Sequence, residues 1–184
     1  GSLSSAQICE IVSQEAQRFF PACEVAGIPV ADGGEGTVDC FLACLSGEKV
    51  KTTVGGPYFA PVDAFYGRFG DTAVIEMATA AGLPLVGEQK NPAKTTTYGV
   101  GELMKLALEA GAKHLILALG GSATNDGGCG AAAAMGTKFF DANGAAFVPT
   151  GETLTRIAGI DNAETEQRRA GITVTAMCDI DNPM

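Results

Sequence analysis

Three segments of the chain combine glycine with carboxylate or hydroxyl side chains. Residues 31–37 read ADGGEGT, residues 120–128 read GGSATNDGG, and residues 178–183 read CDIDNP. Glycine lets the backbone approach a ligand closely, and the amides of such a loop or of a following helix start favour an anion. Carboxylates bind Mg²⁺ through oxygen, and an aspartate can accept the proton of an attacking hydroxyl. The three segments therefore carry the groups that a site for Mg²⁺ and phosphate requires.

Each segment also has an interpretation that needs no ligand. We call residues 31–37 the first glycine loop and residues 120–128 the second glycine loop; either is consistent with a tight strand-to-helix turn. Neither GxxxxGK[ST] nor GxGxxG describes the second loop. Asp179 and Asp181 fall on one side of an extended segment because they are two residues apart, yet a solvated turn before Pro183 also explains them. The ligand interpretation is favoured because all three segments follow predicted strands in one acidic chain.

Composition narrows the classes of partner. The chain has 184 residues, 46% hydrophobic and 18% charged, which suits one globular domain or parts of two. Its formal net charge of −9 argues against nucleic acid and membrane surfaces as partners. Six scattered cysteines without a CxxC pair, and no visible signal peptide, predict reduced thiols in the cytoplasm. The single histidine, His114, opens an apolar strand, so a Ser-His-Asp or Cys-His mechanism has no obvious base.

The order of predicted elements indicates an α/β fold with a mostly parallel sheet, because strands alternate with helices. A capping box at Ser4 and Gln7 begins a first helix, which Pro21 ends. Gly55-Gly56-Pro57 interrupts the pattern and marks a possible domain boundary. Further helices are predicted at residues 38–45, 98–110 and 153–157, strands at residues 24–30, 49–54, 62–69, 72–76, 113–119 and 172–178, and a hairpin at residues 139–148 with its turn at Asn143-Gly144.

Four motifs, in order along the chain, closely resemble the bacterial glycerate kinase family of type I. They are VADGGEGT at residues 30–37, NPAKTTTYGVGEL at 91–103, GGSATNDGG at 120–128 and CDIDNP at 178–183. The resemblance implies ATP-dependent phosphorylation of D-glycerate, with Mg²⁺, at the 2-hydroxyl to give 2-phosphoglycerate. Partners would then be the small substrate and the nucleotide, with no nucleic acid and no membrane.

The resemblance also implies a fold of two α/β domains, one flavodoxin-like and inserted into one with restriction-endonuclease-like topology. The break near Gly55 would be the first crossing, so residues 1–53 are assigned to part of the first domain and residues 54–184 to part of the inserted one. Members of the family extend beyond this chain at both ends. The chain therefore resembles an internal portion, with both domains incomplete.

The chemical roles are assigned to carboxylates. We expect Asp126 and Asp32 near the reacting hydroxyl, and Asp179 and Asp181 as ligands of Mg²⁺. The residues expected to bind substrate or phosphate are Gly33, Gly34, Glu35, Lys94, Thr95, Thr96, Gly120, Gly121, Ser122, Thr124 and Asn125.

Several assignments keep an alternative. Lys94 is equally an ordinary surface lysine, and the hydroxyls of Thr95 and Thr96 either contact ligand or cap the helix that starts at Tyr98. Glu76 is expected on the surface at a strand end, with a buried or site-facing side chain as the alternative. At the level of function, the alternative to a kinase is a non-catalytic α/β module that binds a small phosphorylated anion. A dinucleotide-binding oxidoreductase is disfavoured because no GxGxxG is present.

Overall fold

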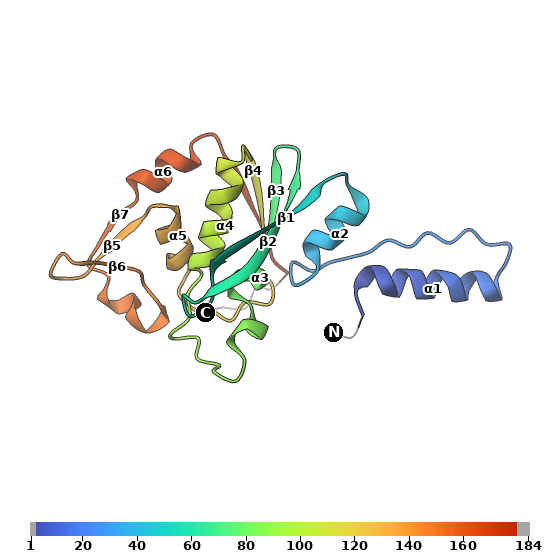
Figure 1. Ribbon diagram of the computed structural model, residues 1–184, viewed down its shortest axis with the longest axis horizontal. Coiled ribbons are helices and arrows are strands. Elements are labelled where there is room, and N and C mark those ends of the chain that lie inside the picture. The colour runs from blue at the N-terminus through green and yellow to red at the C-terminus, as the bar shows by residue number, and fades with distance from the viewer. Residues whose placement is uncertain (1–2, 180–184) are drawn as a thin grey trace.

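The computed structural model describes residues 3–179 and contains two β-sheets together with α-helices and 3₁₀ helices (Figure 1). The α-helices are α1 (Ser5–Phe19), α2 (Thr37–Cys44), α3 (Met77–Ala81), α4 (Tyr98–Glu109), α5 (Cys129–Met135) and α6 (Ala163–Arg169), and the 3₁₀ helices are η1 (Leu83–Val86) and η2 (Gly151–Arg156). The strands are β1 (Glu48–Gly55), β2 (Pro61–Phe69), β3 (Thr72–Glu76), β4 (His114–Ala118), β5 (Lys138–Phe140), β6 (Ala146–Phe147), β7 (Gly159–Asp161) and β8 (Thr173–Met177). The fold is therefore mixed α/β, as the sequence predicted.

The larger sheet has five strands in the order β1-β2-β3-β4-β8. β1, β2 and β3 are antiparallel neighbours, whereas β4 and β8 run parallel to β3. Helices α3 and α4 precede β4, and α5 and α6 precede β8, as parallel crossovers require. The sheet is thus mixed rather than mostly parallel, because hydrophobic alternation predicts a strand without giving its direction.

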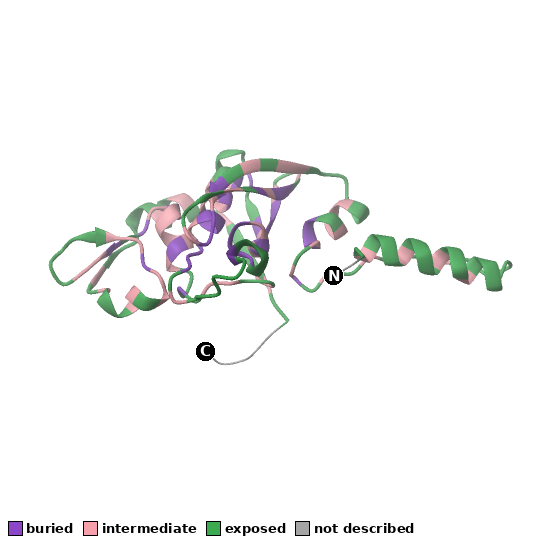
Figure 2. Ribbon diagram, turned by 60° about the horizontal axis from the view of Figure 1, so that its bottom comes forward, coloured by how far each residue is buried: buried purple, intermediate pink, exposed green. Residues whose placement is uncertain are grey.

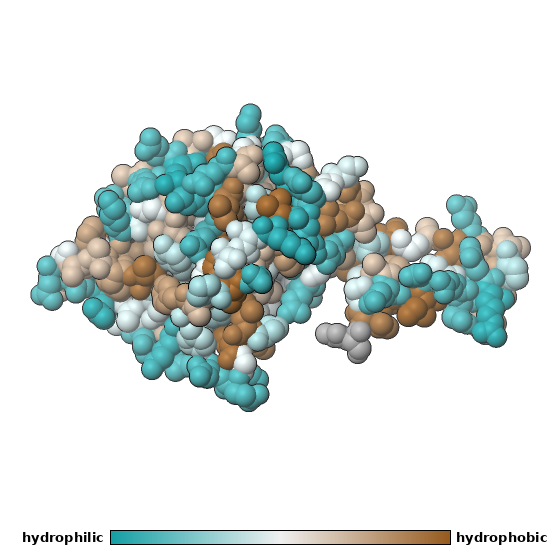
Figure 3. Space-filling view, in the orientation of Figure 1, coloured by the Kyte–Doolittle hydropathy of each residue, from teal (hydrophilic) through white to brown (hydrophobic). Residues whose placement is uncertain are grey.

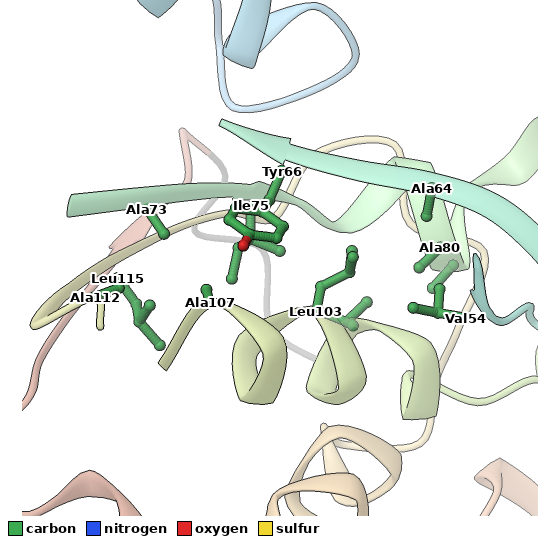
Figure 4. Packing of buried hydrophobic residues seen from close by; sticks show 12 residues of the cluster. Val54, Ala64, Tyr66, Ala73, Ile75, Ala80, Leu103, Ala107, Ala112 and Leu115 are labelled. Carbon is green, nitrogen blue, oxygen red and sulfur yellow. The ribbon is translucent and has the colours of Figure 1, made fainter. Parts of the chain in front are cut away.

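Helices cover both faces of this sheet. Successive side chains of a strand point to opposite faces. On one face, Ile75 of β3 packs in a buried cluster with Leu103 and Ala107 of α4 (Figure 4). On the other face lies α2, whose Val38 is so close to β2 that a Cβ added at Gly67 would be 3.0 Å from it. One face of the sheet at β3 therefore packs against α4 and the other packs against α2. The candidate site lies near the α2 face.

The smaller sheet, β6-β5-β7, is antiparallel and lies at the end of the molecule opposite α1 (Figure 1). Its β5–β6 hairpin turns at Asn143-Gly144, where Gly144 has a φ of 79°. The predicted hairpin is confirmed. The helix predicted at residues 153–157 is a 3₁₀ helix, η2, that starts two residues earlier.

Helix α1 extends away from the rest of the molecule, and none of its residues is buried (Figures 1 and 2). Its start is the predicted capping box, in which the Ser4 hydroxyl accepts from the Gln7 amide and the Gln7 side chain accepts from the Ser4 amide. Apolar side chains, including Ile8 and Val12, are exposed along it, and Figure 3 shows brown apolar surface on this arm. Neither α1 nor any other helix within residues 3–179 is long and apolar enough to cross a membrane.

Residues 24–30, predicted as a strand, are extended but do not belong to a sheet. The segment runs beside α1: the Val30 amide donates to the Ser5 hydroxyl at 2.9 Å, and a Cβ at Gly27 would be 3.1 Å from the Cβ of Cys9. A β-strand forms only when a neighbouring strand accepts its hydrogen bonds. Within the described part of the chain no strand lies beside this segment, so the prediction was wrong.

The expected domain boundary between residues 53 and 54 falls inside β1. This strand pairs with β2 along its whole length, from Glu48 opposite Arg68 to Gly55 opposite Pro61. Residues 48–53 therefore share a sheet with the strands that follow. The division of the chain into two nested domains stays a prediction.

Candidate functional site

The candidate site lies at the carboxyl edge of the three parallel strands. The last residues of β3, β4 and β8 are in register: Glu76 lies opposite Ala118, and Ala118 lies opposite Met177. The second glycine loop leaves β4 at this edge, and residues 178 and 179 leave β8 there. In sheets of this kind, ligands gather where parallel strands end. The second glycine loop and the residues that follow β8 therefore leave the sheet at the same edge.

The first and second glycine loops touch each other at this edge. The Gly120 amide donates to the Gly33 carbonyl at 2.8 Å. A Cβ added at Gly120 would lie 2.7 Å from the backbone of Gly34, so only glycine allows this approach. A Cβ at Gly33 would lie 2.7 Å from the Met177 carbonyl oxygen, which itself accepts from the Leu119 amide at 3.1 Å. The first glycine loop, the second glycine loop and the end of β8 thus meet at Gly33.

The second glycine loop is also held from the other side, by the chain that follows β3. The Leu83 amide donates to the Gly121 carbonyl at 3.0 Å, and the Ala123 amide donates to the Ala81 carbonyl at 2.9 Å. The buried Thr95 hydroxyl donates to the Ala123 carbonyl at 2.7 Å. The Thr95 side chain therefore anchors the loop, in addition to any contact with ligand.

Asp126 is 1% exposed, and its carboxylate joins the starts of two helices. It accepts from the Thr97 amide at 2.8 Å and from the Thr97 hydroxyl at 2.9 Å, at the start of α4. It also accepts from the amides of Gly128 and Gly130, each at 3.1 Å, at the start of α5. The Thr96 hydroxyl adds a longer contact of 3.4 Å. The carboxylate is therefore enclosed and surrounded by donors of the chain itself.

Glu76 is a second buried carboxylate that accepts hydrogen bonds from backbone amides, here at the end of the first glycine loop and the start of α2. This carboxylate, 3% exposed at the end of β3, accepts from the Val38 amide at 2.6 Å and from the Gly36 amide. Burial raises the pKa of Glu76 and the two amides oppose that shift; the nearby charges of Asp39 and Lys49 act in opposite directions. The favoured expectation of a surface Glu76 was wrong and the buried alternative is confirmed, because β3 turns this side chain toward α2.

These two carboxylates change what the helix starts can bind. The amides at a helix N-terminus favour an anion, and the sequence predicted that they would face substrate phosphate. At α2 the anion in contact is Glu76, and at α4 and α5 it is Asp126. These amides already donate to a carboxylate of the chain and are not available to phosphate. A bound phosphate would have to contact other groups of the two glycine loops.

The exposed polar side chains are those that a ligand would meet. Asp32 is exposed, and its Oδ1 accepts from the Gly34 amide at 2.9 Å in a tight turn. In the second loop, Ser122 and Asn125 are exposed, and the hydroxyls of Ser122 and Thr124 lie 2.8 Å apart. Lys94 is exposed in the neighbouring segment. These residues supply carboxylate, hydroxyl, amide and ammonium groups on the two glycine loops and on the segment that precedes α4.

Glu35 faces a different space from the one between the two loops. It lines a cleft of about 650 Å³ between the start of α1 and the first glycine loop, together with Ser5 and Asp39. The proposed ligand contact of Glu35 therefore lies on the α1 side of the loop.

The residues at this edge of the sheet fit a Mg²⁺ ion that is bound by only one or two protein carboxylates. Within residues 3–179, no three side chains of His, Cys, Asp or Glu gather as a metal-binding group. Asp32, next to Gly33, and Asp179, two residues after Met177, are exposed, and Asp181 lies outside the described residues. Because Mg²⁺ is commonly held by one or two carboxylates, waters and substrate phosphates, this donor set suits it.

Neither His114 nor Cys129 offers a competing nucleophilic mechanism in this region. His114 begins β4, at the end of the strand far from the candidate site, and its Nε2 lies 3.9 Å from an Asp71 carboxylate oxygen. Cys129 follows the second glycine loop, but burial and the Asp126 carboxylate raise the pKa of its thiol. A raised pKa disfavours the thiolate, which is the nucleophilic form of cysteine, so Cys129 is not a competing nucleophile.

Comparison with known proteins identifies the family of this chain. The family model described as the glycerate kinase family matches residues 1–184. The chain is 45% identical over 186 residues to a glycerate kinase from Bacillus cereus and 41% identical to glycerate 2-kinase from Escherichia coli, covering 100% of this chain and 49% of each relative. A crystal structure from Salmonella typhimurium LT2, of a protein named as a glycerate kinase 2, matches with a TM-score of 0.87 at 39% identity, covering 99% of this chain and 50% of that one. The chain thus spans about half the length of these relatives, and it belongs to the glycerate kinase family.

Proposed function

We propose that the protein phosphorylates D-glycerate at the 2-hydroxyl, with ATP as phosphoryl donor and Mg²⁺ as metal ion. The observation that carries this proposal is the contact between Gly33 and Gly120, which brings an exposed aspartate and a hydroxyl-rich loop to the carboxyl edge of one sheet. Phosphoryl transfer depends mainly on positioning and on charge neutralisation. Membership of the kinase family supports the same reaction class.

Asp32 is proposed as the base that accepts the proton of the reacting hydroxyl. It is exposed, and a local hydrogen bond from the Gly34 amide fixes one of its oxygens. Mg²⁺ would be held by Asp179 and, as the sequence predicts, by Asp181; when bound it neutralises phosphate charge. Substrate and phosphate contacts are assigned to the residues exposed on the second glycine loop, to the first loop at Gly33, Gly34 and Glu35, and to Lys94.

Asp126 is proposed to act as a second essential carboxylate, in one of two ways. The sequence predicts a base, and that role requires access to substrate. The buried side chain, surrounded by amides and hydroxyls of Thr97 and of the α5 start, favours a positioning role. The two roles predict different stabilities for a variant that lacks the Asp126 charge. If Asp126 is a positioning residue, the variant loses both folding stability and turnover rate.

The reaction is tested on the complete gene product with D-glycerate, ATP and Mg²⁺. The product is identified by phosphorus NMR, which separates 2-phosphoglycerate from 3-phosphoglycerate. ATP-dependent formation of 2-phosphoglycerate is the expected result, with loss of turnover when EDTA removes Mg²⁺. Binding of a phosphorylated anion without any turnover would favour the non-catalytic module instead. A cytoplasmic location, predicted from the cysteines, stays a prediction.

A further inference from the structure

We propose that Glu76 is a positioning residue that holds the first glycine loop, and through it Asp32, at the carboxyl edge of the sheet. The inference deepens the proposed function and rests on it for its kinetic part. Neither the glycine motifs nor the assigned carboxylates include Glu76. Its role follows from where β3 ends and from which backbone groups its side chain meets.

The first glycine loop is held at few points, and Glu76 provides one end of that support. At the Asp32 end, the Gly33 carbonyl accepts from the Gly120 amide at 2.8 Å. At the other end, Glu76 accepts from the amides of Gly36 and Val38, the latter at 2.6 Å. Only a few residues separate the two ends, so a shift at Gly36 is transmitted to Asp32.

The backbone at Gly36 explains why a carboxylate is required there. Gly36 is the N-cap residue that precedes α2; its φ is 88°, and as a glycine it has no side chain to cap the helix. Within the loop, the Thr37 hydroxyl is turned back to the Gly34 carbonyl at 2.7 Å and does not cap the helix. Amides at a helix start that lack a cap need another acceptor. Glu76 supplies that acceptor from the sheet, which fixes the loop to the strand that carries the site.

A matched carboxylate elsewhere in the chain provides the control for this chemistry. Glu102 of α4 accepts from the Gly55 amide at 2.6 Å, the same distance as between Glu76 and Val38. The Glu102 bond ties α4 to the end of β1 and does not involve the first glycine loop. Glu76→Gln and Glu102→Gln therefore remove the same charge from the same type of bond at two places.

Hydrogen–deuterium exchange of the complete gene product tests the structural part without any assay of activity. In Glu76→Gln, a neutral amide replaces the carboxylate and presents an NH₂ group to one of its two donors. We expect amide exchange in residues 31–40 to be about tenfold faster or more, because a buried amide that loses its acceptor opens more readily. Glu102→Gln should leave exchange in residues 31–40 unchanged. Unchanged exchange there in Glu76→Gln, or acceleration spread evenly over the whole chain, would overturn the proposal.

Steady-state kinetics test whether the held loop matters for the reaction. Ile75→Val serves as the control, because Ile75 is fully buried on the opposite face of β3 and touches the α4 core. Well below the melting temperature, Glu76→Gln should lower kcat/KM for glycerate about tenfold or more, since small displacements of reacting groups are costly. Ile75→Val should stay within about twofold of wild type. Equal kcat/KM in the two variants would contradict a positioning role. If the wild-type protein does not phosphorylate glycerate at all, the proposed function fails and the exchange result alone decides the role of Glu76.

Discussion

Replacing Gly120 with alanine tests whether the two glycine loops must touch for the site to work. An alanine Cβ would lie 2.7 Å from the Cα and N atoms of Gly34 and 3.0 Å from the carbonyl carbon of Gly33. These neighbours are backbone atoms, so no side-chain rotation can relieve the overlap. Ordinary contact begins at 3.4 Å, so the loops must separate by about 0.7 Å.

That separation has an energetic and a catalytic consequence. The bond from the Gly120 amide to the Gly33 carbonyl, 2.8 Å long, would lengthen to about 3.5 Å and cease to be a good hydrogen bond. Overpacking and the weakened bond together should lower the free energy of unfolding by about 2 kcal/mol. Because Asp32 is next to Gly33, kcat/KM for glycerate should fall by about 10²-fold as the reacting groups are displaced.

The assay combines urea unfolding with steady-state kinetics on the complete gene product. Gly159→Ala is the matched control, because a Cβ there meets its nearest atom, in Phe140, at 3.8 Å and the residue lacks a positive φ. It should change neither quantity appreciably. Gly121 is a poorer test position, because its φ of 71° would strain any side chain whatever it touched. Wild-type kcat/KM and stability in Gly120→Ala would refute the claim that the loops must be in contact.

Three further changes probe the carboxylates. Asp32→Asn should lower kcat by about 10²–10⁴-fold and leave the urea midpoint nearly unchanged, since the side chain is exposed; near-normal kcat would remove Asp32 as the base. Asp126→Asn should lower the free energy of unfolding by about 3 kcal/mol, measured by urea unfolding, because an NH₂ group would face buried donors; unchanged stability with a lost kcat would support the base role instead. The raised pKa of Glu76 means that the folded state binds its proton more tightly, so the stability of wild type relative to Glu76→Gln should increase as the pH falls through the folded pKa toward the ordinary glutamate value. Thermal unfolding of both proteins across this pH range measures the difference, and a difference that does not vary with pH would show that Glu76 has the same pKa in both states.

Local features were predictable from the sequence because local atoms decide them. The capping box at Ser4 and Gln7 needs only four consecutive residues, and the turn at Asn143-Gly144 needs a glycine that tolerates positive φ. Both are confirmed. The strand predicted at residues 24–30 failed for the opposite reason, since its composition fits a strand but pairing depends on a neighbour.

The convergence of the strand ends was predictable from the order of elements, but the role of the buried carboxylates was not. Glu76 is one residue from Ile75, and only the three-dimensional path of β3 decides that the first faces α2 and the second faces α4. Likewise, the sequence cannot tell whether the hydroxyls of Thr95 and Thr96 meet a ligand or the chain. In the structure both donate to groups of the second glycine loop.

The contact between Gly33 and Gly120 also bears on how the protein folds. The two residues are far apart along the chain, and β3, β4 and the connection between them must be in place before they can meet. Closing so long a loop costs entropy that local helix formation does not. We therefore expect the hairpin of β1 and β2 to form early and the site to form among the last events of folding. On denaturation the order reverses, so activity should disappear at lower urea concentration than the packing of α4 on the sheet.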